Sequence, residues 1–77
     1  MSIEDRVNKV LVDGIGIEPA ELCLTACLKD NLGIDSTEMV EVIVAMEKEF
    51  GVKVPDGVIG GGTTIKDLVS YFGRTVQ

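Results

Sequence analysis

The stretch at residues 32–50, LGIDSTEMVEVIVAMEKEF, contains a glycine turn followed by the start of a long amphipathic helix. Asp35 can cap that helix, and Glu38, three positions later, completes a pattern close to a capping box. This places Ser36 at the first helical position. Because Asp35 already serves as the cap, the Ser36 hydroxyl has no obvious structural role, and we expect it to carry the chemistry.

The predicted helix has two apolar faces. At about 100° per residue, five side chains fall within an arc of roughly 100° and form the expected core stripe: Met39, Val42, Ile43, Met46 and Phe50. Val40 and Val44 lie outside this arc on a flank that they share with Glu47, and Thr37 and Glu41 lie to one side. Exposed apolar residues bordered by acids are typical of a partner-binding face. The alternative is a solvated charged face with half-buried valines.

Composition limits what Ser36 can do. With 77 residues, 45% of them hydrophobic, the chain is predicted to form one small domain (1–77) with room for a core but not for a deep catalytic pocket as well. The 7 basic and 13 acidic residues give a net charge of -6, which disfavours nucleic acid and membrane surfaces and favours basic protein partners. No apolar run approaches the roughly 20 residues of a membrane span, so we expect a cytoplasmic location.

The chain contains no histidine, which excludes Ser-His-Asp and Cys-His catalysis and removes the commonest zinc ligand. Cys23 and Cys27 have no second cysteine pair with which to form a zinc site, so no metal site is predicted. We interpret both cysteines as small buried hydrophobic residues, not as a redox pair. Any activation of Ser36 must therefore come from outside the chain.

Two further helices are predicted from apolar periodicity, one at residues 3–13 capped by Ser2 and one that starts after Thr64 and is closed by Gly73. A long loop at 14–32, with a short helical turn near 19–23, is expected to connect two helices that run in similar directions. Residues 55–59 can form one short helix, although the glycines at 57 and 60–62 weaken it. The predicted fold is all-α: a small four-helix bundle of three main helices and a short, frayed third helix.

Four segments together resemble an acyl carrier protein: DNLGIDS at 30–36, VEVI at 40–43, EKEFGV at 47–52 and VPD at 54–56. The resemblance covers nearly the whole chain. It implies that the protein is not an enzyme and that Ser36 is esterified to 4'-phosphopantetheine from coenzyme A, whose thiol holds acyl groups as thioesters. A separate phosphopantetheinyl transferase would attach this arm with the help of a magnesium ion, and Asp35 would support the encounter.

The same resemblance implies how partners bind. The helix after Ser36 would face basic patches on acyl-transferring and condensing enzymes, with Glu41 and Glu47 as acidic contacts and Val40 and Val44 as apolar contacts. Thr37 departs from the family, which usually has leucine or another large apolar residue after the serine. We expect a monomer that binds neither nucleic acid nor membrane.

Two more departures from the family bear on the pathway. Lys48 stands where an acid is common, and the glycines at 60–62 replace residues that support the short third helix. Such departures favour polyketide or other secondary metabolism over housekeeping fatty acid synthesis. Two alternatives remain: an aminoacyl or peptidyl carrier, against which Ile34, Asp35 and the acidic helix argue, and a helical interaction module that never carries a cofactor.

Overall fold

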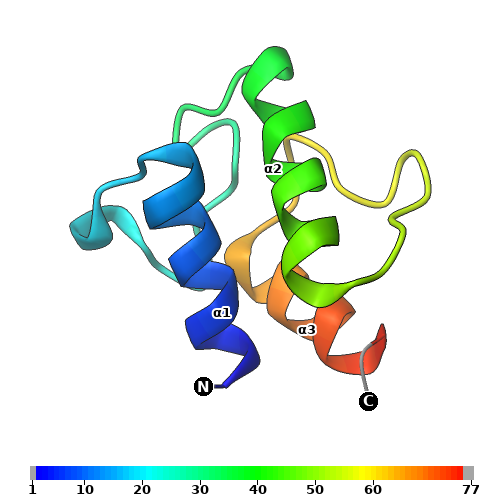
Figure 1. Ribbon diagram of the computed structural model, residues 1–77. Coiled ribbons are helices and arrows are strands. Elements are labelled where there is room, and N and C mark those ends of the chain that lie inside the picture. The colour runs from blue at the N-terminus through cyan, green and yellow to red at the C-terminus, as the bar shows by residue number, and fades with distance from the viewer. Residues whose placement is uncertain (1, 76–77) are drawn as a thin grey trace.

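The computed structural model describes residues 2–75, in which three α-helices pack around a shared core (Figure 1). They are α1 (Ile3–Lys9), α2 (Ser36–Phe50) and α3 (Ile65–Thr75). A π-helical segment (Val10–Ile15) continues α1, and a 3-10 turn (Pro19–Glu21) lies in the long loop. Within residues 2–75 the only β-structure is an isolated antiparallel bridge between Cys27 and Thr64. The predicted all-α class is confirmed.

The three helix starts are as the sequence predicts. Directly before each helix, the side chain of the N-cap residue accepts a hydrogen bond from the backbone N–H three positions later. These bonds are Asp5 N to Ser2 Oγ (3.0 Å), Glu38 N to Asp35 Oδ1 (2.8 Å) and Asp67 N to Thr64 Oγ1 (3.1 Å). In all three cases the reciprocal bond is also present, so each cap is a complete capping box.

The helix ends depend on which glycines adopt a positive φ. Gly51, with φ at +68°, ends α2 as predicted. The first helical stretch does not end at Asp13, because the backbone continues in π form until Gly16, where φ is +91°. Gly73 was expected to close the last helix, but it does not have a positive φ, and α3 continues through it to Thr75.

The predicted short third helix does not form. Residues 56–59 make a turn in which Gly57 has φ at +86°. Ile59 is nevertheless buried and anchors the turn to the core. The described chain is therefore a bundle of three α-helices, not four.

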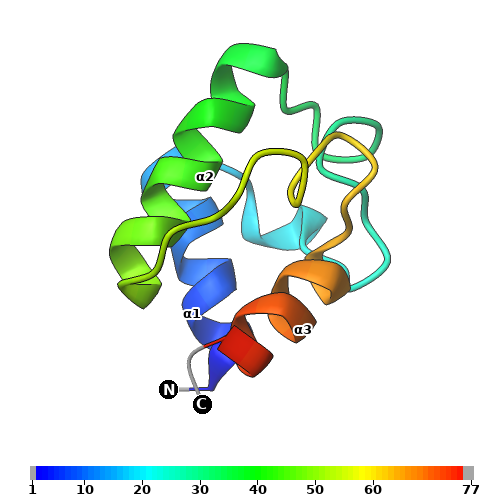
Figure 2. The ribbon, with the colours of Figure 1, turned by 90° about the vertical axis from the view of Figure 1, so that its right-hand side faces the viewer.

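Two views show the direction of the helices (Figures 1 and 2). α1 starts at the lower end of the molecule and α2 starts at the upper end, so they run in opposite directions and the expectation of similar directions is wrong. The long loop returns to the upper end before α2 begins. Ser36 consequently lies at the end of the molecule opposite the start of α1.

The core joins all three helices. From α2, Val42, Met46 and Phe50 are buried, whereas Met39 and Ile43 at the side of the stripe are half-buried. The Phe50 ring stacks on Phe72 of α3 with centroids 4.5 Å apart and an angle of 8° between the planes. The stripe read from the sequence thus faces the core.

Backbone hydrogen bonds tie the long loop to the segment before α3, and the two run side by side in Figure 2. Leu28 N donates to Thr63 O (3.0 Å), and Ile65 N donates to Ala26 O (3.2 Å). Ile34 N donates to Leu28 O (3.0 Å) within the loop. The chain entering α2 is therefore fixed by both local and distant contacts.

Candidate functional site

Ser36 is the first residue of α2, and its side chain is exposed. Gly33, with φ at +71°, makes the turn that leads to it, and the buried Ile34 anchors that turn to the core. None of the side-chain hydrogen bonds found among residues 2–75 involves the Ser36 hydroxyl. The hydroxyl is therefore free to react with a group brought from outside.

Asp35 has a structural role beside it. The Asp35 carboxylate accepts from Glu38 N (2.8 Å), and its carbonyl accepts from Met39 N (2.8 Å). Because the first N–H groups of a helix have no intrahelical acceptor, the N–H groups at the start of α2 can favour an anion on Ser36. The negative charge of Asp35 opposes part of that gain.

A groove of about 530 Å³ begins at Ser36 and is mainly apolar. It is lined by Lys29, Ile34, Asp35, Ser36, Met39, Val40, Ile43 and Gly61. Of these residues, Lys29 and Gly61 were not identified from the sequence, because they reach the groove from loops that only the fold brings to α2. The one sequence feature that could have pointed to Lys29 is its position directly before the DNLGIDS segment.

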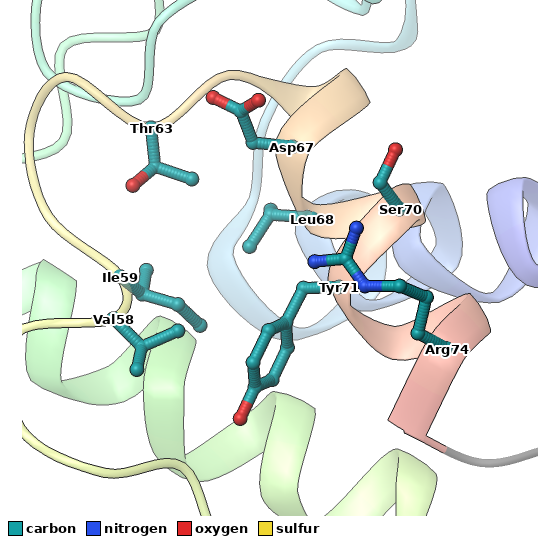
Figure 3. A pocket seen from close by; sticks show the side chains of 8 residues that line it. All are labelled: Val58, Ile59, Thr63, Asp67, Leu68, Ser70, Tyr71 and Arg74. Atoms are coloured by element: carbon teal, nitrogen blue, oxygen red, sulfur yellow. The ribbon is translucent and has the colours of Figure 1, made fainter.

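A second hollow, of about 410 Å³, lies between the 58–63 segment and α3 (Figure 3). Val58, Ile59 and Thr63 form its loop side, and five residues of α3 form the other: Asp67, Leu68, Ser70, Tyr71 and Arg74. It contains none of the site residues predicted from the sequence. The hollow is therefore separate from the Ser36 site.

The surface formed by Thr37, Val40, Glu41, Val44 and Glu47 is called the α2 outer face below. Val40 and Val44 are 61% and 42% exposed, and Thr37 and Glu41 are also exposed. The structure thus places these four residues on the outside of α2. Their binding of partners stays a prediction.

The acids of α2 are not equivalent. Glu47 is half-buried, and its Oε2 accepts a hydrogen bond from Val54 N (2.8 Å). Glu49 Oε2 accepts from Arg6 Nε (2.8 Å). Glu41 is exposed and takes part in none of the hydrogen bonds or salt bridges found among residues 2–75. Part of the acidic run therefore stabilises the fold, and Glu41 is the acid best placed for a partner.

The predicted burial of both cysteines is wrong for Cys23, which is exposed, while Cys27 is half-buried. The Cys23 Sγ lies 3.3 Å from Thr25 Oγ1, and this side-chain hydrogen bond, with a second one from the Thr25 backbone, lowers the pKa of the Cys23 thiol.

Two features that would indicate other functions are absent from residues 2–75. They contain no group of three or more His, Cys, Asp or Glu side chains arranged to bind a metal ion. No helix in this part of the chain has the length and apolar composition needed to cross a membrane.

Comparison with known proteins gives two concordant matches. Residues 5–72 match the family described as phosphopantetheine attachment site. The chain is also 40% identical over 67 residues to the acyl carrier protein of Zymomonas mobilis subsp. mobilis, an alignment that covers 87% of this chain and 86% of that protein.

Proposed function

The chain belongs to the acyl carrier protein family, and we propose that it holds acyl intermediates as thioesters on a 4'-phosphopantetheine arm attached to Ser36. Members of this family bear that arm covalently and act as carriers, not as enzymes. They interact with a phosphopantetheinyl transferase and with enzymes that handle acyl groups. The observation that carries the assignment is the exposed, unbonded hydroxyl of Ser36 at the first position of α2.

The residues around Ser36 fit such an arm. The Ser36 oxygen forms the new bond to the phosphorus of the arm, and the bond from that phosphorus to the adenosine 3',5'-bisphosphate of coenzyme A breaks, so adenosine 3',5'-bisphosphate leaves. The N–H groups at the start of α2 suit the resulting phosphodiester. The mainly apolar groove that begins at Ser36 can accommodate the neutral part of the arm. The chain has no histidine, and the adjacent Asp35 carboxylate is used as the helix cap, so we assign the base that removes the hydroxyl proton to the transferase.

Mass spectrometry tests the attachment. Incubation with coenzyme A, magnesium and a broad-specificity transferase should add one phosphopantetheine to the wild type and none to Ser36→Ala. Ser70→Ala, which removes another exposed serine, should be modified like the wild type. A wild-type mass that does not change under these conditions would contradict the proposal.

For the pathway, we favour polyketide or related secondary metabolism over fatty acid synthesis. Thr37 presents a small polar side chain where a large apolar contact is usual, and the short third helix is replaced by a turn. Both differences alter surface that a fatty acid enzyme would meet. A reconstituted bacterial fatty acid system should elongate the acylated wild type more slowly than its own carrier, and Thr37→Leu should raise that elongation rate. Equal elongation rates for the wild type and the system's own carrier would show that the preference is wrong.

Three broader predictions accompany this function: a cytoplasmic location, a monomeric state and a single carrier domain over 1–77, whose limits lie outside the described residues. Fractionation of the native host and size-exclusion chromatography with light scattering would test the first two. Limited proteolysis of the natural protein would test the third.

A further inference from the structure

We propose that Lys29 binds the phosphodiester that joins the arm to Ser36, and that Gly61 keeps the Lys29 side chain in position for this contact. The inference rests on the proposed function, because it requires the arm on Ser36. It adds to the site Lys29, which directly precedes the DNLGIDS segment at 30–36.

The Lys29 backbone is fixed from two directions. Its N–H donates to Gly61 O (3.1 Å), which ties it to the segment before α3. Its carbonyl accepts from Gly33 N (3.1 Å), which ties it to the turn that leads to Ser36. These two bonds fix the position of the Lys29 backbone, and so of its Cα–Cβ bond, relative to Ser36.

Gly61 leaves space for the Lys29 side chain. A Cβ atom added at Gly61 would lie 3.1 Å from Lys29 Cβ and 3.2 Å from Lys29 Cδ, closer than ordinary van der Waals contact. The aliphatic part of Lys29 thus packs directly on the Gly61 backbone. Both residues line the groove that contains Ser36.

The charges at the groove favour an anion near Ser36. Lys29 is the only basic residue among those lining the groove, and the only acid, Asp35, is used as the helix cap. The one salt bridge within residues 2–75 joins Arg6 and Glu49, so no carboxylate there neutralises Lys29. A lysine ammonium on its flexible stem suits a phosphate as a point charge.

The phosphodiester is a better ligand for Lys29 than the acyl cargo. It is bonded directly to the Ser36 oxygen whatever the arm carries, so its position is fixed while the thioester end can move. The lysine charge would also offset the repulsion between this phosphodiester and Asp35. The contact is therefore expected in the holo form with or without a cargo.

The test compares apo and holo forms of the wild type, Lys29→Met, Lys29→Arg and the matched control Lys66→Met, which removes an exposed lysine that does not line the groove. The mass of each holo form first establishes that the arm is attached. At low salt, the difference in Tm between holo and apo protein should be about 1–3 °C smaller in Lys29→Met than in the wild type, as expected for one exposed ion pair. Lys29→Arg and Lys66→Met should resemble the wild type, and high salt should remove the effect.

Phosphorus NMR provides a readout at the site itself. The chemical shift of the phosphodiester should differ between wild-type and Lys29→Met holo protein and should be unchanged in Lys66→Met. Equal Tm differences and equal phosphorus shifts in the wild type and Lys29→Met would overturn the proposal. An unmodified wild type would instead refute the attachment to Ser36, so the two failures are distinct.

Two glycines of the same loop test the role of Gly61. Gly61→Ala keeps the lysine charge but crowds its side chain, whereas a Cβ at Gly62 meets no atom within 4 Å. Neither glycine has a positive φ. Gly61→Ala should therefore change the phosphorus shift towards that of Lys29→Met, and Gly62→Ala should not. The same shift in both alanine variants would show that Gly61 does not position Lys29.

Discussion

At the scale of single residues, two neighbours at the start of α2 have separate duties. Asp35 uses its carboxylate for the helix cap, and Ser36 points a free hydroxyl to solvent. A serine that capped the helix itself would have its oxygen engaged with a backbone N–H. The aspartate thus leaves the Ser36 oxygen available for the proposed attachment. This division of roles could be inferred from the sequence, because capping depends on residues only three positions apart.

Cys23 gives a prediction at this scale. Because the hydrogen bonds from Thr25 lower its thiol pKa, Cys23 should form thiolate at lower pH and react with iodoacetamide faster than the less exposed Cys27. Thr25→Val should raise the pH at which Cys23 reacts, because the largest stabilisation of the thiolate is lost. Peptide mass spectrometry after timed alkylation measures both rates.

Thr37→Val is the control for that experiment, since it removes a hydroxyl far from Cys23 in the sequence and should leave the rates unchanged. If the pH profile of Cys23 is the same in the wild type and Thr25→Val, the hydrogen bond does not influence the thiol. Reagents aimed at the thiol of the arm should also be checked for labelling of Cys23.

At the scale of one element, α2 combines a buried stripe with the α2 outer face. The structure separates the acids that the sequence treats alike: Glu47 and Glu49 bond to other parts of the chain, and Glu41 does not. The sequence could not make this distinction, because Val54 and Arg6 reach α2 only after folding. The effects of charge reversal along α2 should therefore differ from site to site.

Glu41→Lys should weaken binding to a basic partner about 2- to 5-fold at low salt without loss of stability, and should flatten the salt dependence of binding. Surface plasmon resonance with the transferase as immobilised partner measures this. Glu21→Lys makes the same charge change on the exposed 3-10 turn and should have a smaller effect. Equal effects of the two variants would mean that net charge, not the α2 outer face, determines binding.

Glu47→Lys should behave differently, because it also removes the acceptor of the Val54 N–H. We expect it to lower the free energy of unfolding by about 1 kcal/mol in addition to weakening binding. Glu47→Gln retains an acceptor oxygen and should recover most of the stability. Urea denaturation of the three proteins separates the two contributions, and a Glu47→Lys variant as stable as the wild type would contradict a structural role.

At the scale of the molecule, Arg6 joins the first helix to the end of α2. Its Nε and Nη2 donate to the side chain and carbonyl of Glu49 at 2.8 and 2.7 Å, and its guanidinium lies 4.5 Å from the centre of the Phe50 ring. Phe50 in turn stacks on Phe72. One side chain thereby connects α1 to α2 and contacts the same Phe50 ring that stacks on α3.

Arg6→Ala should lower the free energy of unfolding by about 1–2 kcal/mol, since it removes two charge-assisted hydrogen bonds and a cation–π contact that are partly shielded from water. Lys9→Ala removes an exposed charge from the same helix and should cost much less. Arg6→Lys should be intermediate, because a lysine cannot donate in the same paired geometry. Urea unfolding provides the comparison, and equal losses for Arg6→Ala and Lys9→Ala would argue against this connection.

The overall fold was predictable where the controlling interactions are local. The starts of the three helices, the capping box at Asp35 and Glu38 and the core stripe of α2 follow from spacing along the chain, and the structure confirms these predictions. The contact between Lys29 and Gly61 depends on how the long loop pairs with the segment before α3. Such pairing joins residues more than thirty positions apart, and no local pattern encodes it.

Ser36 lies at the opposite pole from the start of α1 and the end of α3, and this affects how the protein can be linked to other molecules. In both ribbon views α1 begins and α3 ends at one pole of the molecule, while α2 begins at the other (Figures 1 and 2). A tag, a linker or a neighbouring domain fused to either end would thus leave from the pole remote from the serine. With the arm on Ser36, as we propose, the acyl group would be presented at the pole opposite such an attachment. This geometry is compatible with a free carrier and with a carrier domain in a multidomain synthase.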